Sequence, residues 1–145
     1  KANVFYVMGK KKDAIDEYQK VVRLSPNHTL ALNNLAYLSM EENRDPSQAL
    51  LYAFRAFLLA PQNNDIRDTF GYVLLKNGKV DQGLSMLKKA SEGNPKNPSI
   101  WYHLALGYKE RVDTARTAEC LQKALELGDF PEARDAKAML DKMKK

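Results

Sequence analysis

Apolar residues recur along this chain with the spacing of a helix face. In the stretch 64–97 they form two periodic segments, residues 66–76 and 80–91, which are joined by Asn77-Gly78. Apolar residues three and four positions apart lie on one side of a helix, whereas an Asn-Gly pair interrupts a helix and favours a turn. The stretch therefore predicts two helices that fold back on each other and share one apolar face.

The rest of the chain repeats this plan about every 34 residues. The period is marked by Ala56, Ala90 and Ala124, and by Pro26, Pro61 and Pro95. A fixed period of this length indicates a solenoid, in which each unit covers the apolar face of its neighbour. We divide the chain into a partial repeat at 1–28, repeats at 29–63, 64–97 and 98–128, and a capping helix at 131–144.

The fourth repeat carries a recognisable motif. It contains Trp101-x-x-Leu104-Ala105-x-x-Tyr108, followed by Leu121 and Ala124. On these residues the chain resembles tetratricopeptide repeat (TPR) proteins. The resemblance implies an all-α fold, a right-handed α-α superhelix (TPR solenoid) of antiparallel helix pairs with a C-terminal capping helix. It also implies a protein–protein interaction scaffold, in which the first helix of each pair, helix A, lines a concave face that binds a peptide or a partner helix.

A looser similarity concerns the source of the chain. Residues 68–74, 80–84 and 101–105 are similar to bacterial TPR proteins of envelope, exopolysaccharide and secretion systems. This implies a bacterial protein and leaves its location, cytoplasmic or periplasmic, open. The chain starts inside a repeat and without an initiator Met, so we expect a fragment of a longer protein.

Projecting the family's concave face onto this sequence gives a set of candidate partner-binding residues. They are Asn3, Asn33, Asn34, Tyr37, Asp68, Thr69, Tyr72, Lys76, Tyr102, His103 and Lys109. Asn side chains both donate and accept hydrogen bonds, which suits a peptide backbone, and Tyr offers flat amphipathic contact. Two alternatives stay open: the asparagines are merely tolerated polar residues, or the tyrosines are partly buried between repeats.

One TPR binding mode is disfavoured by the residues present. TPR domains that clamp the carboxylate tail of heat-shock chaperones use Lys and Arg together with two Asn. Asn3 and Asn34 stand at matching positions, but Asp65 and Thr69 stand where the cations are required. Without those cations a terminal carboxylate has no counterion. We expect instead local tolerance of a basic ligand near Asp65 and Asp68.

Self-assembly is the alternative function. Helix B of the second repeat, residues 46–59, is apolar on more than one face. Such a helix either packs against neighbours on both sides or meets another chain. The apolar residues Val4, Phe5 and Val7 at the start of the chain offer a second edge for a homo-oligomer.

Composition and candidate chemistry indicate no other function. The formal charge is +5, but its lysines fall at loops and helix ends rather than on one face, so we expect a solvated surface and no nucleic-acid partner. The sequence contains no run of 18 apolar residues, so it predicts no membrane-spanning helix. Neither His28 nor His103 has a metal ligand at helical spacing, and we expect His28 at the surface or at a helix cap. We place no acid beside His103 from the sequence.

The single Cys120 excludes an internal disulfide and a multi-cysteine metal site, and we expect an ordinary partly buried thiol. We therefore predict no enzyme activity, no cofactor and no metal.

Overall fold

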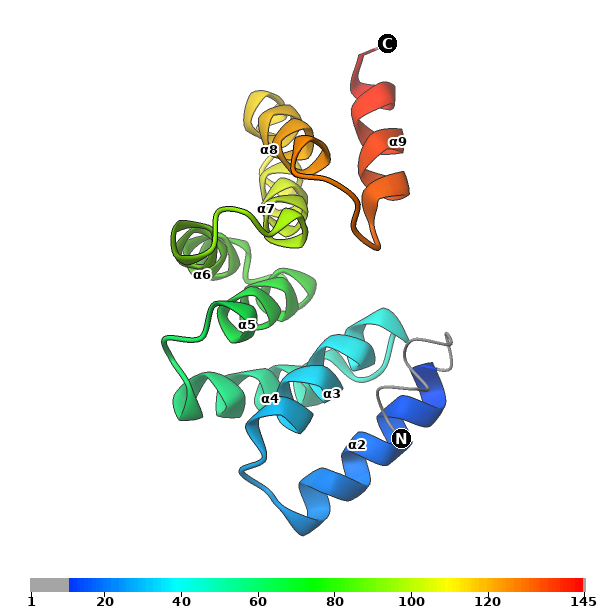
Figure 1. Cartoon of the computed structure of the whole chain (residues 1–145), viewed down its shortest axis with the longest axis vertical. Helices are drawn as coiled ribbons and strands as arrows, with labels where there is room; N and C mark the ends of the chain where they lie inside the picture. The colour runs from blue at the N-terminus through cyan, green and yellow to red at the C-terminus, as the bar shows by residue number, and fades with distance from the viewer. Residues whose placement is uncertain (1–10, 145) are drawn as a thin grey trace.

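The structure, a computed structural model, describes residues 11–144, and this range folds into helices joined by short turns, with no strand among them (Figure 1). The helices are α2 (Lys11–Leu24), α3 (Thr29–Glu41), α4 (Pro46–Leu59), α5 (Asn64–Lys76), α6 (Val80–Gly93), α7 (Pro98–Glu110), α8 (Thr114–Glu126) and α9 (Ala133–Met143). The predicted all-α solenoid of paired helices is confirmed. Asn3 and the apolar edge at Val4, Phe5 and Val7 lie outside the described residues.

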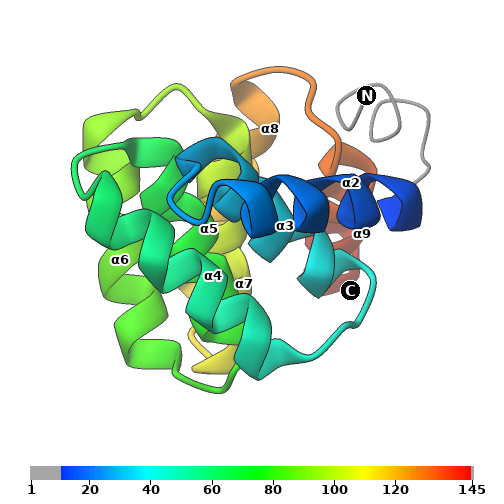
Figure 2. The same cartoon turned by 90° about the horizontal axis from the view of Figure 1, so that it is seen from below.

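The helix pairs stack along an arc. In Figure 1 the arc runs from α2 at the bottom to α9 at the top, and Figure 2 views the stack from its α2 end. Helices α3, α5 and α7 are the A helices, and α5 contacts both of the others. Each A helix also packs against the B helix that follows it, while α9 packs on α8 and closes the stack. The A helices thus form one continuous wall.

Side-chain caps set the starts of the A helices. His28, Asn63 and Asn97 each precede an A helix, and their side chains accept a backbone N–H from its first turn. These bonds satisfy donors that have no partner inside the helix. The expectation that His28 is a capping residue is confirmed. In α2, which begins at Lys11, the acidic Asp13 lies in the first turn.

Small residues allow α5 and α6 to cross closely. A Cβ atom at Gly71 would lie 2.6 Å from Leu87 Cγ, and one at Gly83 would lie 2.8 Å from the carbonyl oxygen of Gly71. Distances this short leave no room for a side chain without moving the backbone. The two glycines therefore set how near the helices of this repeat approach each other.

Helix α4 packs against α3 and α5 and keeps an exposed outer face. Its buried residues are Ala49, Ala53 and Ala56. Leu51 and Leu58 are 66% and 62% exposed, and Phe54 is 46% exposed. The interpretation of α4 as a helix that touches neighbours on both sides is confirmed, because it packs against α3 and α5, and its Phe54 and Phe57 rings contact Phe70. The alternative, a surface that meets another chain, stays a prediction.

The turns between the helices of each pair use a left-handed backbone. Asn43, Gly78 and Val112 follow α3, α5 and α7 and have φ of 55°, 79° and 58°. Glycine adopts this region without cost and Asn tolerates it, whereas a β-branched residue is strained there. Val112 is also 83% exposed, so little packing compensates for the strain.

We predict that Val112→Gly raises the free energy of unfolding by about 0.5–1 kcal/mol, because relief of the left-handed strain exceeds the greater flexibility of unfolded glycine. Urea denaturation measures the change. The matched variant is Gly78→Val, which should lower the free energy, since a Cβ there meets nothing within 4 Å and adds only backbone strain. An unchanged or less stable Val112→Gly variant would contradict this account.

Candidate partner-binding groove

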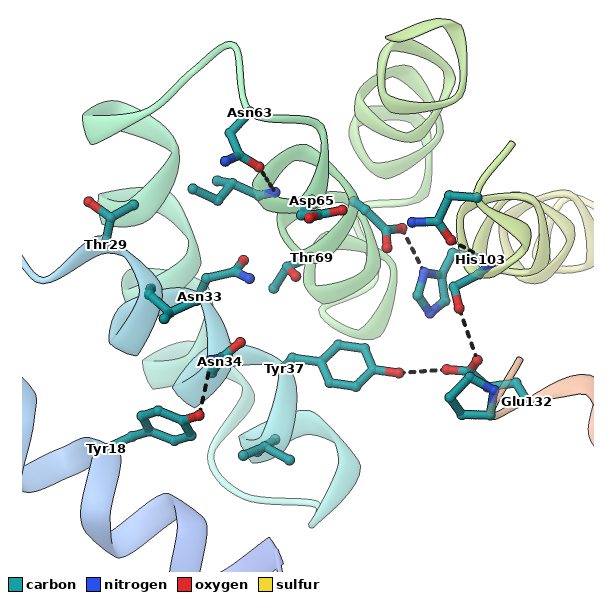
Figure 3. A pocket seen from close by; sticks show the side chains of 17 residues that line it. Tyr18, Thr29, Asn33, Asn34, Tyr37, Asn63, Asp65, Thr69, His103 and Glu132 are labelled. Carbon is teal, nitrogen blue, oxygen red and sulfur yellow. Dashed lines mark hydrogen bonds and ion pairs between the residues drawn. The ribbon is translucent and has the colours of Figure 1, made fainter. Parts of the chain in front are cut away.

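The concave side of the stack contains a cavity of about 600 Å³ that runs along most of α3 and along the N-terminal halves of α5 and α7 (Figure 3). We call it the groove. Its lining residues are Tyr18, Thr29, Leu30, Asn33, Asn34, Tyr37, Leu38, Asn63, Asp65, Ile66, Asp68, Thr69, Asn97, Ser99, His103, Pro131 and Glu132. They come from every helix pair and from the connection that leads into α9. A segment lying in the groove would therefore contact several repeats at once.

Most of the predicted site residues lie together in this groove. They are Asn33, Asn34, Tyr37, Asp68, Thr69 and His103. Asn33, Asp68 and His103 hold the same position in successive repeats, 35 residues apart. The stacking of α3, α5 and α7 brings these equivalent positions side by side.

The other predicted residues within 11–144 do not line the groove. Tyr72 and Tyr102 are buried among the packed helices. The Lys76 ammonium lies 5.5 Å from the centre of the Tyr72 ring, and Lys109 borders a separate small cavity beside Val112. Both lysines stand near the C-terminal ends of α5 and α7, whereas the groove follows the N-terminal halves of these two helices. The position of a residue in the repeat thus predicted which face of the helix it lies on. It did not predict how deeply the side chain is buried or how far along the helix the groove extends.

Several lining residues were not anticipated by the sequence reasoning. Asn63 and Asn97 immediately precede A helices, so the preference of Asn for caps was the signal that could have placed them. Glu132 had no comparable signal, since it follows the last repeat. It enters the groove because the α8–α9 connection passes over the concave side (Figure 1).

The four asparagines of the groove have different roles. Asn63 and Asn97 cap helices, and Asn34 Nδ2 donates to the Tyr18 hydroxyl oxygen at 3.0 Å. The Oδ1 atom of Asn33 is buried and has no hydrogen-bond partner among residues 11–144. Buried polar atoms are nearly always paired, and each exception needs an explanation. Asn33, which lines the groove, therefore holds an unpaired acceptor beneath the surface of the groove wall.

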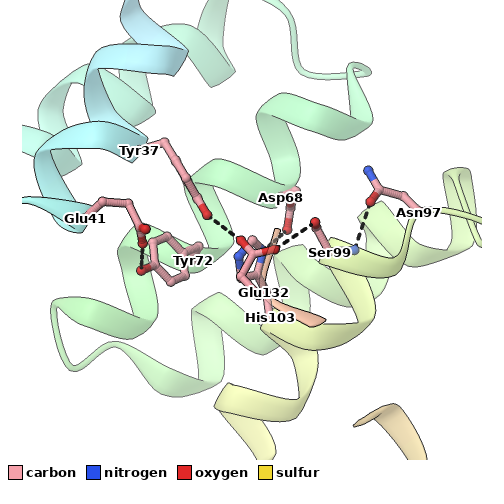
Figure 4. A network of polar contacts seen from close by, with 8 residues as sticks. All are labelled: Tyr37, Glu41, Asp68, Tyr72, Asn97, Ser99, His103 and Glu132. Atoms are coloured by element: carbon pink, nitrogen blue, oxygen red, sulfur yellow. Dashed lines mark hydrogen bonds and ion pairs between the residues drawn. The ribbon is translucent and has the colours of Figure 1, made fainter. Parts of the chain in front are cut away.

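Glu132 links the two ends of the groove (Figure 4). The Tyr37 hydroxyl donates to one carboxylate oxygen at 2.7 Å, and Ser99 Oγ donates to the other at 3.2 Å. These bonds join α3 and α7 to the segment that leads into α9. Both donors are neutral, so the carboxylate is held in place without a cation.

The tyrosines around Glu132 remain protonated donors. Burial, together with the charges of Glu132 and Glu41, raises the pKa of Tyr37 far above its ordinary value. Burial and Glu41 do the same for the pKa of Tyr72, whose hydroxyl donates to Glu41 at 2.8 Å. Burial raises the pKa of Tyr102 to about 12. Their hydroxyl hydrogens are therefore fixed features of the site at physiological pH.

A buried ion pair lies at the base of the groove. His103 Nδ1 is 2.6 Å from Asp68 Oδ1, and the His103 side chain is only 2% exposed. The expectation that no acid accompanies His103 is therefore wrong, because stacking places Asp68 of the preceding repeat beside it. Burial lowers the pKa of His103, but the charge and hydrogen bond of Asp68 outweigh it, and the net pKa is raised.

The described residues show no arrangement for a metal centre, an activated thiol or a membrane span. Among residues 11–144 no group of three or more His, Cys, Asp or Glu side chains is placed to hold a metal ion. Burial raises the pKa of the Cys120 thiol to about 11, which keeps it protonated and weakly nucleophilic. None of the helices in this range combines the length and apolar character needed to cross a bilayer.

Sequence comparison connects the chain to a known repeat family. Residues 1–65 match the tetratricopeptide repeat family. Over 77 residues the chain is 32% identical to the photosystem I assembly protein Ycf3 of Prochlorococcus marinus subsp. pastoris, a match that spans 51% of this chain and 44% of the relative. The chain thus matches less than half of the length of that curated relative.

Solved structures of similar fold are TPR proteins. YrrB, described as a TPR protein with an unusual peptide-binding site, is 26% identical with a TM-score of 0.72, over 94% of this chain and 71% of YrrB. TTC0263 of Thermus thermophilus, a thermophilic TPR protein, is 24% identical with a TM-score of 0.81, over 96% and 77%. MamA of Desulfovibrio magneticus RS-1 shares the fold at 21% identity and a TM-score of 0.72, over 98% and 78%.

The His103–Asp68 pair predicts a pH-dependent stability. A raised folded pKa means that the pair's contribution is fully present below the unfolded pKa of about 6.5, and is lost as the pH rises through the folded pKa. Urea denaturation from pH 6 upward should therefore show a falling free energy of unfolding. In Asp68→Asn the carboxylate that raises the pKa of His103 is gone and burial, which lowers that pKa, remains. The fall in the free energy of unfolding with rising pH should therefore vanish or reverse. Identical pH profiles for the two proteins would contradict the assignment.

Proposed function

Since the chain is a tetratricopeptide repeat protein, we propose that it is a protein–protein interaction scaffold whose groove binds an extended segment of a partner. The segment would lie across α3, α5 and α7 and end near Glu132. YrrB and Ycf3 support this proposal, because one is described by a peptide-binding site and the other is named an assembly protein.

The unpaired oxygen of Asn33 carries the proposal. A buried acceptor without a donor costs about 1–3 kcal/mol, so a chain that keeps one in a groove wall gives up stability there. The terminal torsion of an Asn side chain is broad, and a rotation about it turns the oxygen toward the groove. An extended peptide has N–H groups free of internal hydrogen bonds. Asn33 is thus suited to accept one of them.

Replacing Asn33 separates folding from binding. We predict that Asn33→Leu raises the free energy of unfolding by about 1 kcal/mol, because it removes the unpaired acceptor and keeps the branched shape of the side chain. The same variant should bind a peptide at least about fivefold more weakly, because the lost acceptor takes one hydrogen bond with it. The probe is a fluorescein-labelled peptide selected on the wild-type chain from a phage-displayed random library, with affinity read by fluorescence anisotropy.

The neighbouring Asn34 is the matched control for stability. Asn34→Leu removes the bond to Tyr18 and should therefore destabilise the protein, in contrast to Asn33→Leu. Selected peptides that bind Asn33→Leu as tightly as the wild type would count against the groove as the binding site. Failure to select any peptide would count against peptide binding altogether.

Self-assembly through α4 is the second candidate function. Leu51, Phe54 and Leu58 are exposed and lie at the three- and four-residue spacing of a helix–helix seam. A second copy placed antiparallel across a twofold axis near Phe54 would put Leu51 of one copy on Leu58 of the other. The only charged residue of α4 is Arg55, which donates to the carbonyl oxygen of Pro26. The second copy is therefore the proposed occupant of this face.

Light scattering after size-exclusion chromatography tests this candidate. We predict that the wild-type chain forms a dimer at high concentration and that Leu58→Glu is a monomer, because a charge on the seam has no partner across the axis. Leu30→Glu, a change at an exposed leucine of the groove, should leave the dimer intact. A wild-type monomer at every concentration would contradict the self-assembly candidate.

A further inference from the structure

The groove has a charge opposite to that of the chain. The chain carries a formal charge of +5, yet the groove is lined by Asp65, Asp68 and Glu132 and by no Lys or Arg among its described lining residues. The lysines predicted there, Lys76 and Lys109, lie elsewhere. The concave face is thus an acidic surface on a basic protein.

Two of these carboxylates lack a cation. Asp68 is paired with His103. Glu132 is held by the hydroxyl groups of Tyr37 and Ser99, which do not neutralise its charge. Asp65 is exposed in the first turn of α5 and has no hydrogen bond or ion pair within residues 11–144. The charges of Asp65 and Glu132 are therefore available to a ligand.

The hydrogen-bonding groups of the groove favour the same kind of ligand. Three donors of the groove are used inside the protein, since Asn34 Nδ2 bonds Tyr18 and the hydroxyls of Tyr37 and Ser99 bond Glu132. The groove also holds two acceptors with no donor among residues 11–144, the Asp65 carboxylate and the buried Oδ1 of Asn33 on the neighbouring helix α3 (Figure 3). Lys and Arg are the side chains that carry several donors and no acceptor. They complement the groove in both charge and hydrogen bonding.

We propose that the partner segment bound in the groove carries a lysine or arginine whose cationic group pairs with Asp65, next to an N–H donor that bonds Asn33 Oδ1. The proposal rests on the groove being the peptide-binding site, and it names the chemistry that the site selects. Glu132 adds negative potential from the far side of the groove. An acidic segment would meet the carboxylates of Asp65 and Glu132 and find no Lys or Arg in the described lining.

A charge exchange tests the proposal. Random peptides are selected by phage display on the wild-type chain, and the best are measured as labelled synthetic peptides by fluorescence anisotropy. We expect the selected peptides to be enriched in Lys or Arg. Asp65→Lys should weaken their binding about tenfold, since an attraction becomes a repulsion. A peptide in which the basic residue is replaced by Glu should then regain affinity for Asp65→Lys.

The control is Asp141→Lys, which makes the same charge change at an exposed position of α9 that does not line the groove. It should leave binding within about twofold, because exposed charges beyond a Debye length are largely screened at physiological salt. Equal losses in Asp65→Lys and Asp141→Lys, or selected peptides without basic residues, would overturn the proposal. Peptides weakened by Asn33→Leu but indifferent to Asp65→Lys would overturn it while leaving the proposed function standing. Peptides indifferent to both changes would remove the proposed function as well.

Discussion

Each helix pair in this chain has an apolar face that only a neighbouring pair can cover, and this need for stacking shapes everything else in the structure. Stacking puts α3, α5 and α7 in contact as one wall. Because the pairs are nearly equal in length, equivalent positions recur at the same level of that wall. Asn33, Asp68 and His103, far apart in the sequence, thereby become neighbours on the concave side. The groove is thus a consequence of how the core is covered.

The repeat period was enough to predict the helices, the turns and the concave face, because each depends on local spacing. It did not reveal contacts between repeats: Asp68 beside His103 requires the actual approach of α5 and α7. The position of Glu132 depends on the path of the connection after the last repeat, which no period describes. Tyr72 was placed on the correct helix but not at its correct depth, since periodicity gives a direction and burial depends on the neighbours.

The polar groups of the concave side divide into those that stabilise the fold and those left for a partner. The His103–Asp68 pair and the bonds from Tyr37 and Ser99 to Glu132 connect different helices of the stack. Asn33 and Asp65 keep acceptors that no described residue satisfies. A folded surface that leaves hydrogen-bond acceptors unpaired is expected of a binding site rather than of a structural spacer. The exposed face of α4 differs from the groove, because its uncovered side chains are apolar.

Nuclear magnetic resonance mapping of a bound peptide tests the central claim most directly. The isotope-labelled chain is titrated with a peptide selected on it, and backbone and side-chain amide shifts are followed. The account predicts that the largest shifts fall on the N-terminal halves of α3, α5 and α7, with the Asn33 side-chain amide among them. Shifts confined to the outer helices α4, α6 and α8, with Asn33 unchanged, would contradict it.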